Sequence, residues 1–332
     1  MDVVAIAAAL GLAFVLGISD APNATAALVA SRAAEWRAAI AFSFVFHLLG
    51  ALAGGTAVAL TIDGLVQVDT ADVPAVYAAA CLAAIGFVST GARRGLPTSA
   101  TYGVIGGLAG AGVAASGWDA IRWGGFHGLR PYGMIGVLGG LLLSPILGVA
   151  CGFLLRGGFS GALRRGTRRL LGPVRGGVWV AAGAVALSDG VNDGQKAMGL
   201  AAGVLVATGH LATFSIPAWL RAVTALALAL GTAVGGGRVI RRVGRGYFRP
   251  DPVDVLAAEI SGAGVIFAAA AVGAPVSTSE TVTASFVGVG ADRHPRHVRW
   301  VGVFHTVSAW AITVPVCAVL GAFLYACATL LT

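Results

Sequence analysis

Apolar segments long enough to cross a lipid bilayer follow one another along almost the whole chain. A membrane-spanning helix needs about 20 apolar residues. Segments of roughly that size lie at 38–61, 74–91, 132–155, 177–207, 211–236 and 254–272. Charged residues make up only 11% of the 332 residues, against about 25% in soluble domains. Because backbone polar groups in lipid must be satisfied internally, these segments predict an all-α polytopic membrane protein.

A short polar sequence occurs twice inside the apolar segments. Residues 17–24 read Gly-Ile-Ser-Asp-Ala-Pro-Asn-Ala, and residues 190–197, which start 173 positions later, read Gly-Val-Asn-Asp-Gly-Gln-Lys-Ala. A charged side chain at the bilayer centre costs about 2.5–3.5 kcal/mol on insertion scales, so it marks a functional site by default. One such aspartate could serve only as a hydrogen bond between helices, but two in matching positions favour a duplicated binding site.

The first copy is expected to interrupt its helix. Residues 3–17 are too few to cross the membrane alone, residues 24–31 complete the length, and Pro22 has no N–H to donate. An interrupted helix frees backbone carbonyls, which join carboxylate and amide oxygens as ligands for a hard cation. The predicted cation-binding residues are Ser19, Asp20, Asn23, Asn192 and Asp193.

Lys196 is the lysine that we place at membrane depth. It follows Asp193 by three residues, so the two side chains share a helix face. The ammonium can either neutralise that carboxylate or face an anionic substrate, and the sequence leaves both roles open.

Two proline motifs lie 178 positions apart. Residues 97–101 read Pro-Thr-Ser-Ala-Thr, and residues 275–279 read Pro-Val-Ser-Thr-Ser. Proline suits the first turn of a helix, and free N–H groups with hydroxyls at a helix start bind anions without a formal positive charge. Hydroxyls there can also satisfy only the backbone, but two copies beside two acidic motifs favour an oxyanion site. The predicted substrate-binding residues are Ser99, Thr101, Ser277, Thr278, Ser279, Asp20, Asp193 and Lys196.

Two glutamates lie at or near the predicted membrane depth. Glu280 follows the second proline motif, at the position that Tyr102 has in the first, and Glu259 lies on the span before it. A carboxylate at this depth can carry a proton, so both residues are candidate proton carriers. Glu280 could instead reach a polar vestibule.

The two halves of the chain are predicted to be repeats of opposite topology. Residues 1–155 and 177–332 each hold about five membrane segments, joined by a basic linker at 156–176. The acidic loop 62–73 and the arginine-rich loop 237–250 are equivalent in position, and arginine marks the cytoplasmic side, so they lie on opposite sides. Inverted repeats with interrupted helices or re-entrant hairpins at the midplane are typical of secondary transporters.

The net charge of +8 comes almost wholly from arginines in the predicted loops. Topology and anionic lipid headgroups explain such arginines better than nucleic acid does. With the linker in the cytoplasm, both termini are predicted to be extracytoplasmic, in a multi-pass protein of the cell membrane.

These motifs resemble those of the inorganic phosphate transporter (PiT) family, which moves phosphate with sodium ions or protons. That family repeats Gly-x-Asn-Asp followed by Asn or Lys, and Pro-Val-Ser-Thr-Thr-His, once per half. Residues 190–196 match a family copy, residues 17–23 match with Ser19 in place of Asn, and Tyr102 and Glu280 stand where the family has His. The resemblance covers the whole chain and implies a homodimer of inverted-repeat protomers.

The resemblance also implies roles for two groups of residues. It implies cation and phosphate binding by Asp20, Asn23, Asn192 and Asp193. Around the phosphate it implies Ser99, Thr101, Ser277, Thr278 and Ser279. The coupling ion would be Na+ or H+, with no other cofactor.

The predicted function is cation-coupled symport of inorganic phosphate by alternating access, and not an enzymatic one. The same fold could carry sulfate or another oxyanion, and inverted repeats also build ion channels. An intramembrane enzyme with Ser19 as nucleophile and Asp20 as base lacks a nearby histidine and gives the duplication no role. Phosphate is favoured over sulfate because at neutral pH it keeps an O–H that can donate to Asp20 or Asp193.

Overall fold

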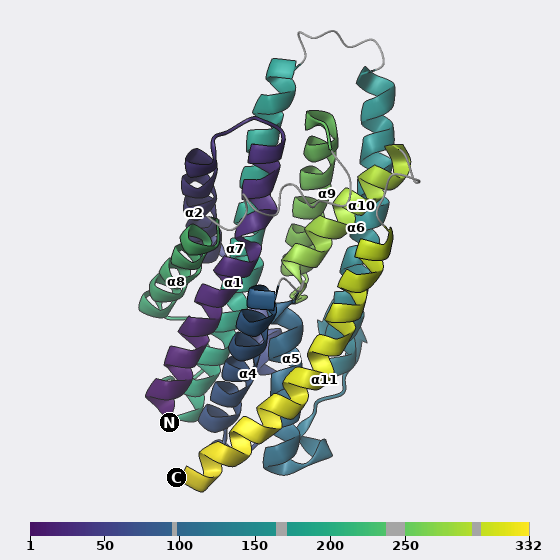
Figure 1. Ribbon diagram of the computed structural model, residues 1–332. Helices are drawn as coiled ribbons and strands as arrows, with labels where there is room; N and C mark the ends of the chain where they lie inside the picture. Colours follow the sequence, from purple (N-terminus) through teal and green to yellow (C-terminus); the bar gives the residue numbers. More distant parts are fainter. Residues whose placement is uncertain (95–97, 164–170, 237–249, 294–299, 332) are drawn as a thin grey trace.

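The computed structural model describes residues 1–94, 98–163, 171–236, 250–293 and 300–331, which form an elongated bundle of helices (Figure 1). The helices of the N-terminal half are α1 (Asp2–Ala30), α2 (Trp36–Ala53), α3 (Ala57–Asp63), α4 (Val73–Arg94), α5 (Ala100–Ser116) and α6 (Gly133–Leu163). Those of the C-terminal half are α7 (Leu171–Ala207), α8 (Ala218–Gly236), α9 (Pro252–Ala271), α10 (Thr278–Arg293) and α11 (Trp300–Leu331).

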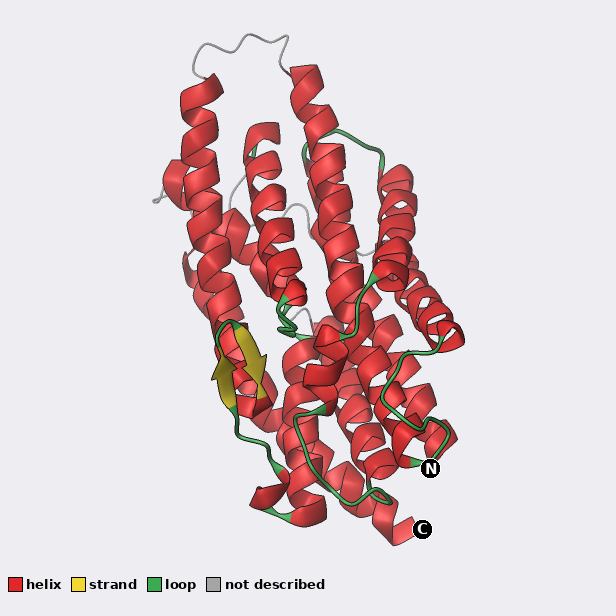
Figure 2. Cartoon of the chain, turned by 180° about the vertical axis from the view of Figure 1, so that it is seen from behind, coloured by secondary structure: helices red, strands yellow, loops and turns green. Residues whose placement is uncertain are grey.

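The segment between α5 and α6 contains the exceptions to the all-α prediction. A 3-10 turn at Trp118–Ala120 precedes two short strands, β1 (Gly125–His127) and β2 (Arg130–Tyr132). The strands pair antiparallel and lie beside the bundle (Figure 2). The fold is otherwise helical, as predicted.

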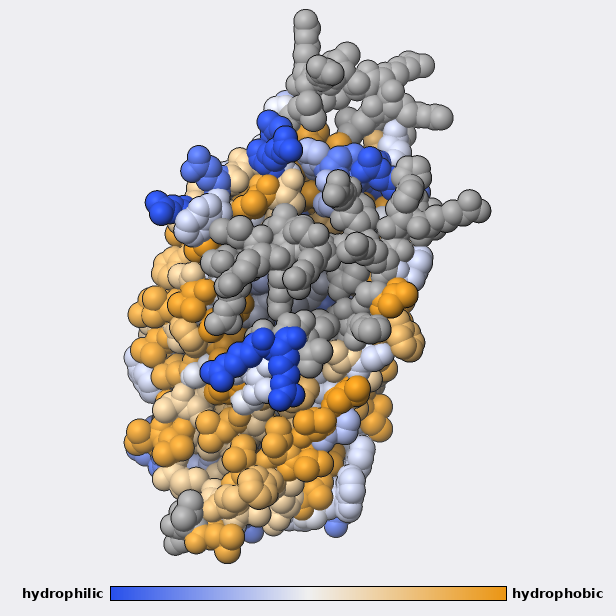
Figure 3. All heavy atoms as spheres, in the orientation of Figure 1, coloured by the Kyte–Doolittle hydropathy of each residue, from blue (hydrophilic) through white to orange (hydrophobic). Residues whose placement is uncertain are grey.

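Seven helices of the described residues are long and apolar enough to cross a membrane. They are α1, α2, α4, α6, α8, α9 and α11. α7 is longer than any of these, at 37 residues, but it carries Asp189, Asp193 and Lys196 in its second half. Figure 3 shows apolar residues over most of the lower part and the flanks of one face, hydrophilic residues gathered at its upper end, and a further hydrophilic group near its middle. The prediction of a polytopic membrane protein is confirmed.

The predicted break of the first helix at the polar motif is wrong, because α1 continues through Pro22. Proline removes one hydrogen bond, the one to the carbonyl four residues earlier, at Ile18. α8 covers that carbonyl so closely that a Cβ on Gly235 would lie 2.5 Å from Ile18 O. α7 also runs unbroken through the second motif. The polar side chains therefore project from continuous helices.

The helical structure is interrupted instead at two connections near the middle of the bundle, between α4 and α5 and between α9 and α10 (Figure 1). The hairpin of α4 and α5 comes from the lower end of the molecule, and that of α9 and α10 comes from the upper end (Figure 1). Ser99 Oγ and Ser277 Oγ lie 3.0 Å apart where the two hairpin tips meet. Pro275 lies in the second connection, before α10 begins, and Pro97 falls outside the described residues. This arrangement agrees with the predicted re-entrant hairpins.

Helix packing occurs in corresponding pairs. α1 packs on α8 as α7 packs on α2, and α6 packs on α10 as α11 packs on α5. Glycines make the first two contacts close: a Cβ on Gly17 would collide with the backbone of Leu228, and one on Gly190 with the backbone of His47. The pairs fit the predicted repeat.

The division of the chain at 1–155, 156–176 and 177–332 remains a prediction. The linker is helical at both ends, because α6 continues to Leu163 and α7 starts at Leu171. Residues 164–170 between them lie outside the described residues.

An ion-pair cluster ties α9 to α6 and α10 near the start of α9. Asp254 is buried, and its Oδ1 accepts a hydrogen bond from Arg156 Nε at 2.5 Å. Its Oδ2 accepts from Arg293 and, at 2.9 Å, from the backbone N–H of Asp251. The sequence predicted neither contact, because both arginines fall in predicted loops.

Replacing Asp254 by Asn should lower the free energy of unfolding by about 3 kcal/mol, because two arginines lose a buried counter-charge. This is the low end for a broken buried pair, since the Arg293 side chain is 35% exposed. Thermal unfolding of the purified protein measures the effect. Asp119→Asn is the control, because Asp119 is exposed and has no ion pair within the described residues. Equal melting temperatures for both variants would contradict the prediction.

Candidate functional site

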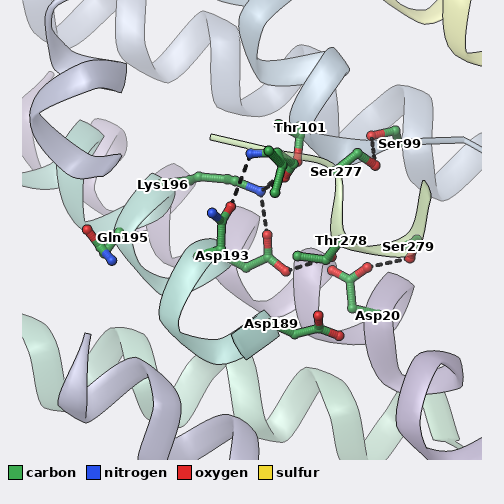
Figure 4. Close-up of polar contacts among 12 residues, drawn as sticks. Asp20, Ser99, Thr101, Asp189, Asp193, Gln195, Lys196, Ser277, Thr278 and Ser279 are labelled. Atoms are coloured by element: carbon green, nitrogen blue, oxygen red, sulfur yellow. Dashed lines mark hydrogen bonds and ion pairs between the residues drawn. The ribbon is translucent and has the colours of Figure 1, made fainter. Parts of the chain in front are cut away.

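The candidate site lies where the two hairpin tips meet α1 and α7 (Figure 4). Lys196 is buried there, and its Nζ donates to Asp193 Oδ1 at 2.5 Å, to Val276 O at 2.5 Å and to Thr101 Oγ1 at 2.8 Å. The lysine therefore joins α7 to both hairpins. Of the two roles that the sequence left open, the structure shows the pairing with Asp193.

Asn192 and Asp193 hold the second hairpin at its tip. Asn192 Nδ2 donates to Ala274 O at 3.0 Å, and Asn192 Oδ1 accepts from the Val276 N–H at 3.3 Å. Asp193 Oδ2 accepts from Thr278 Oγ1 at 3.1 Å. The backbone groups are available because residues 272–277 lie between helices. Asn192 thus braces the hairpin tip in this structure.

The first polar motif binds Ser279, the residue of α10 that follows Thr278. Ser279 Oγ donates to Asp20 Oδ1 at 2.5 Å and also lies 3.3 Å from Asn23 Oδ1. Asn23 Nδ2 donates to Asp189 Oδ2 at 2.9 Å. Adjacent hydroxyls in one turn of α10 therefore bind one carboxylate from each polar motif, and Figure 4 shows both carboxylates beside that turn.

The structure brings most of the predicted site residues together. Those joined by hydrogen bonds are Asp20, Asn23, Ser99, Thr101, Asn192, Asp193, Lys196, Ser277, Thr278 and Ser279. Ser19 is half-buried and makes no hydrogen bond to them within the described residues. Glu280 and Glu259 are buried. The side chains of Tyr102 and Ser277 approach Glu280, although no carboxylate oxygen of either glutamate meets the full geometry of a hydrogen bond in the part of the chain described.

Part of the site was not predicted from the sequence. Asp189 was left out of the predicted site because Leu16 stands at the matching position of the first half, but its Oδ2 accepts from Asn23 and lies 3.7 Å from His47 Nε2. The four-residue spacing from Asp189 to Asp193 places both on one helix face and could have revealed Asp189. Nothing in the sequence places His47 of α2 beside it, and the contribution of the Val276 carbonyl cannot be read from side-chain patterns.

The site holds more carboxyl groups than basic groups. Asp20, Asp189 and Asp193 are all buried, and Asp20 is close enough to the other two to be repelled by them. Among the described lysines and arginines, Lys196 alone forms an ion pair with one of these three. A buried charge is unfavourable unless it is paired. An oxyanion and ionised carboxylates would repel one another here unless protons or cations offset their charge.

Comparison with known proteins agrees with this arrangement. The model of a protein family described as the phosphate transporter family matches the chain twice, at residues 16–171 and 160–321. The chain belongs to the phosphate transporter family. The two matches each cover about half of the chain. Membership of the phosphate transporter family makes the protein a transporter and not an enzyme.

Known proteins of similar sequence match this family member over nearly the whole length of its chain. A protein of Bacillus subtilis (strain 168) is 32% identical over 331 residues, which are 98% of this chain and 96% of the relative. A protein of Rhizobium meliloti (strain 1021) is 34% identical over 328 residues, again 98% and 96% of the two chains. Both relatives are named "Probable low-affinity inorganic phosphate transporter".

A solved structure has the same fold as this phosphate transporter family member. It is described as "The sodium-dependent phosphate transporter" and superposes with a TM-score of 0.87 at 21% identity. The match covers 100% of this chain and 99% of the other. The hairpins and long helices described above therefore form a fold that a solved transporter shares.

Proposed function

We propose that the protein carries inorganic phosphate across the cell membrane together with a sodium ion or a proton, by alternating access. One observation carries the proposal: Thr278 and Ser279, at the start of α10, bind Asp193 of α7 and Asp20 of α1. These contacts between hairpin and helices are side-chain contacts that can break and re-form when the hairpin moves. The names of the relatives support phosphate as the substrate.

The proposed anion position is where the two hairpin tips meet, and phosphate binding there requires the Ser99 and Ser277 hydroxyls, now 3.0 Å apart, to separate. Ser99 is the N-cap residue of α5, but its side chain does not bond the backbone N–H groups there. Those first-turn N–H groups are orphan donors that favour an anion. Thr101 and Ser277 lie beside them, and Thr278 and Ser279 would complete the hydroxyl set. We place the mobile cation at Asp20 and Asn23, with Asp193 and Asn192 holding the hairpin.

Phosphate fits this site better than sulfate. Asp20 accepts from one hydroxyl in the described part of the chain, so its other lone pairs remain open to a donor. Phosphate at neutral pH keeps an O–H and can donate to such a carboxylate, whereas sulfate would meet its repulsion without a hydrogen bond.

Uptake of radiolabelled phosphate into liposomes that contain the purified protein tests the proposal. We expect an imposed sodium or proton gradient to drive uptake, and arsenate but not sulfate to inhibit it. Inhibition by sulfate but not arsenate would indicate a sulfate carrier. Flux that ignores an opposing cation gradient would indicate a channel and would also contradict the proposal.

Glu280 is the proposed proton carrier, with Glu259 as the second candidate. Replacing Glu280 by Gln keeps the shape of the side chain but removes the group that binds and releases a proton. We expect uptake driven by a proton gradient to fall about tenfold, while phosphate binding to the purified protein is retained. Proton-driven uptake by Glu259→Gln, measured in parallel, shows which of the two glutamates carries the proton. Unchanged proton-driven uptake in both variants would contradict these assignments.

We propose further that both termini are extracytoplasmic and that the protein is a homodimer. Both termini lie at one end of the bundle, and the adjoining ends of α6 and α7, which flank the basic stretch, lie at the other (Figure 1). Arginine-rich segments favour the cytoplasmic side. The family resemblance supports the dimer, and cross-linking in native membranes tests it.

A further inference from the structure

Lys196 is the only lysine in a sequence whose 22 basic residues are otherwise arginines. Lysine provides a compact point charge, whereas arginine provides a broad planar group. The Lys196 side chain is only 1% exposed. Its ammonium has three hydrogens, and each has an oxygen partner. An ammonium with all its donors engaged has none left for an oxyanion, so direct phosphate binding by Lys196 is not the role that this geometry supports.

The three oxygens around the Lys196 ammonium are of the kinds that surround a sodium ion. They are a carboxylate oxygen of Asp193, the Val276 carbonyl oxygen and the Thr101 hydroxyl oxygen, all within 2.8 Å of Nζ. Hard cations prefer such oxygens, and in transporters unwound backbone beside a helix supplies the carbonyls. The carbonyl here comes from the connection between α9 and α10. Lys196 therefore occupies an oxygen cage that suits a small cation.

The corresponding place in the first polar motif has no such side chain. Asn23 follows Asp20 by three residues, as Lys196 follows Asp193. Asn23 is neutral, and Asp20 forms no ion pair with a lysine or arginine in the described part of the chain. One acidic motif thus carries its own positive charge, and the other does not.

We propose that the Lys196 ammonium is a tethered substitute for one of two coupling cations, so that the second polar motif binds no mobile cation: a coupling sodium ion binds at the Asp20 motif only, and a coupling proton is carried by Glu280. The inference rests on the proposed function, because it assigns the number of mobile cations to the same site. It also makes Lys196 the residue that sets this number.

Replacing Lys196 by Asn tests the proposal directly, because it gives the second motif the same Asp-x-x-Asn spacing as the first. The freed oxygens should then accept a sodium ion. Uptake of labelled phosphate is measured at constant pH and membrane potential, with sodium replaced stepwise by an impermeant organic cation. Arg175→Asn is the control, because it removes an exposed positive charge from the same helix.

For the wild type and for Arg175→Asn, we expect the rate of phosphate uptake to depend on sodium concentration to the first order or not at all. For Lys196→Asn we expect the order to rise by about one, and uptake without sodium to be about a hundredfold below uptake at saturating sodium. Equal uptake by this variant with and without sodium would overturn the proposal. A folded variant that stays inactive at every sodium concentration would also overturn it.

Binding of radioactive sodium to the purified proteins separates the inference from the proposed function. The Lys196→Asn protein should bind one more sodium ion per chain than the wild type, and equal numbers would overturn the inference. If wild-type liposomes take up no phosphate, the proposed function fails, but this count still decides the inference. If Lys196→Asn does not fold, the wild type decides: second-order sodium dependence contradicts a tethered cation, and first order or none supports it.

Discussion

Asp193→Asn should lower phosphate uptake by about a hundredfold, because removing one partner of a buried, hydrogen-bonded charge pair costs about 2–5 kcal/mol. Asp193 is fully buried and binds both Lys196 and Thr278. Without its charge, the ammonium keeps two neutral partners and becomes an uncompensated buried cation. Initial rates of labelled phosphate uptake into liposomes, corrected for the amount of protein inserted, measure the change.

Two further variants show whether the loss at Asp193 comes from charge. Asp119→Asn changes an exposed aspartate outside the site and should leave uptake unchanged. Asp193→Asn combined with Lys196→Met removes both charges and should recover thermal stability relative to Asp193→Asn alone, without restoring wild-type uptake. Uptake by Asp193→Asn within about twofold of the wild type would show that the second polar motif is not part of the transport site.

Gly190→Ala should destabilise the protein by at least about 3 kcal/mol, because overpacking reaches its largest cost where neighbouring atoms cannot move aside. The added Cβ would collide with His47 O and lie 3.0 Å from Ala51 N, and both are backbone atoms of α2. α2 and α7 would have to separate where they cross. That movement displaces Asp193, one turn further along α7, and a displacement of about 1 Å can cost a hundredfold in rate.

Gly176→Ala is the matched control, because it makes the same change on the same helix. A Cβ at Gly176 has nothing within 4 Å, and alanine is favoured over glycine in a helix by about 1 kcal/mol. Melting temperatures and uptake rates of the two variants should therefore differ clearly. Similar values would contradict the close crossing of α2 and α7.

Internal repetition made much of the site predictable. The 178-residue offset paired Ser99 with Ser277 before any coordinates, and their hydroxyls lie 3.0 Å apart. The offset of the acidic motifs indicated in the same way that Asp20 and Asp193 belong to one site. A repeat predicts such contacts because matching segments of two halves meet near the axis that relates them.

The remaining features depend on contacts that local sequence does not encode. Pro22 was expected to break α1, but the helix continues through it. The carbonyl of Ile18, which loses its hydrogen bond to Pro22, is covered by Gly235 of α8, a residue far along the chain. The hydrogen bond from Lys196 to Val276 involves a main-chain oxygen, which every residue has. Arg156 and Asp254 meet only because α6 packs on α9.

A cryo-electron microscopy structure of the protein in lipid with bound phosphate tests the central claim most directly. We expect phosphate density where the two hairpin tips meet, with the Ser99 and Ser277 hydroxyls moved apart around it and Thr278 and Ser279 within hydrogen-bonding reach. Phosphate density elsewhere, such as beside the arginines that bind Asp254, together with no density where the hairpin tips meet, would contradict the proposed site.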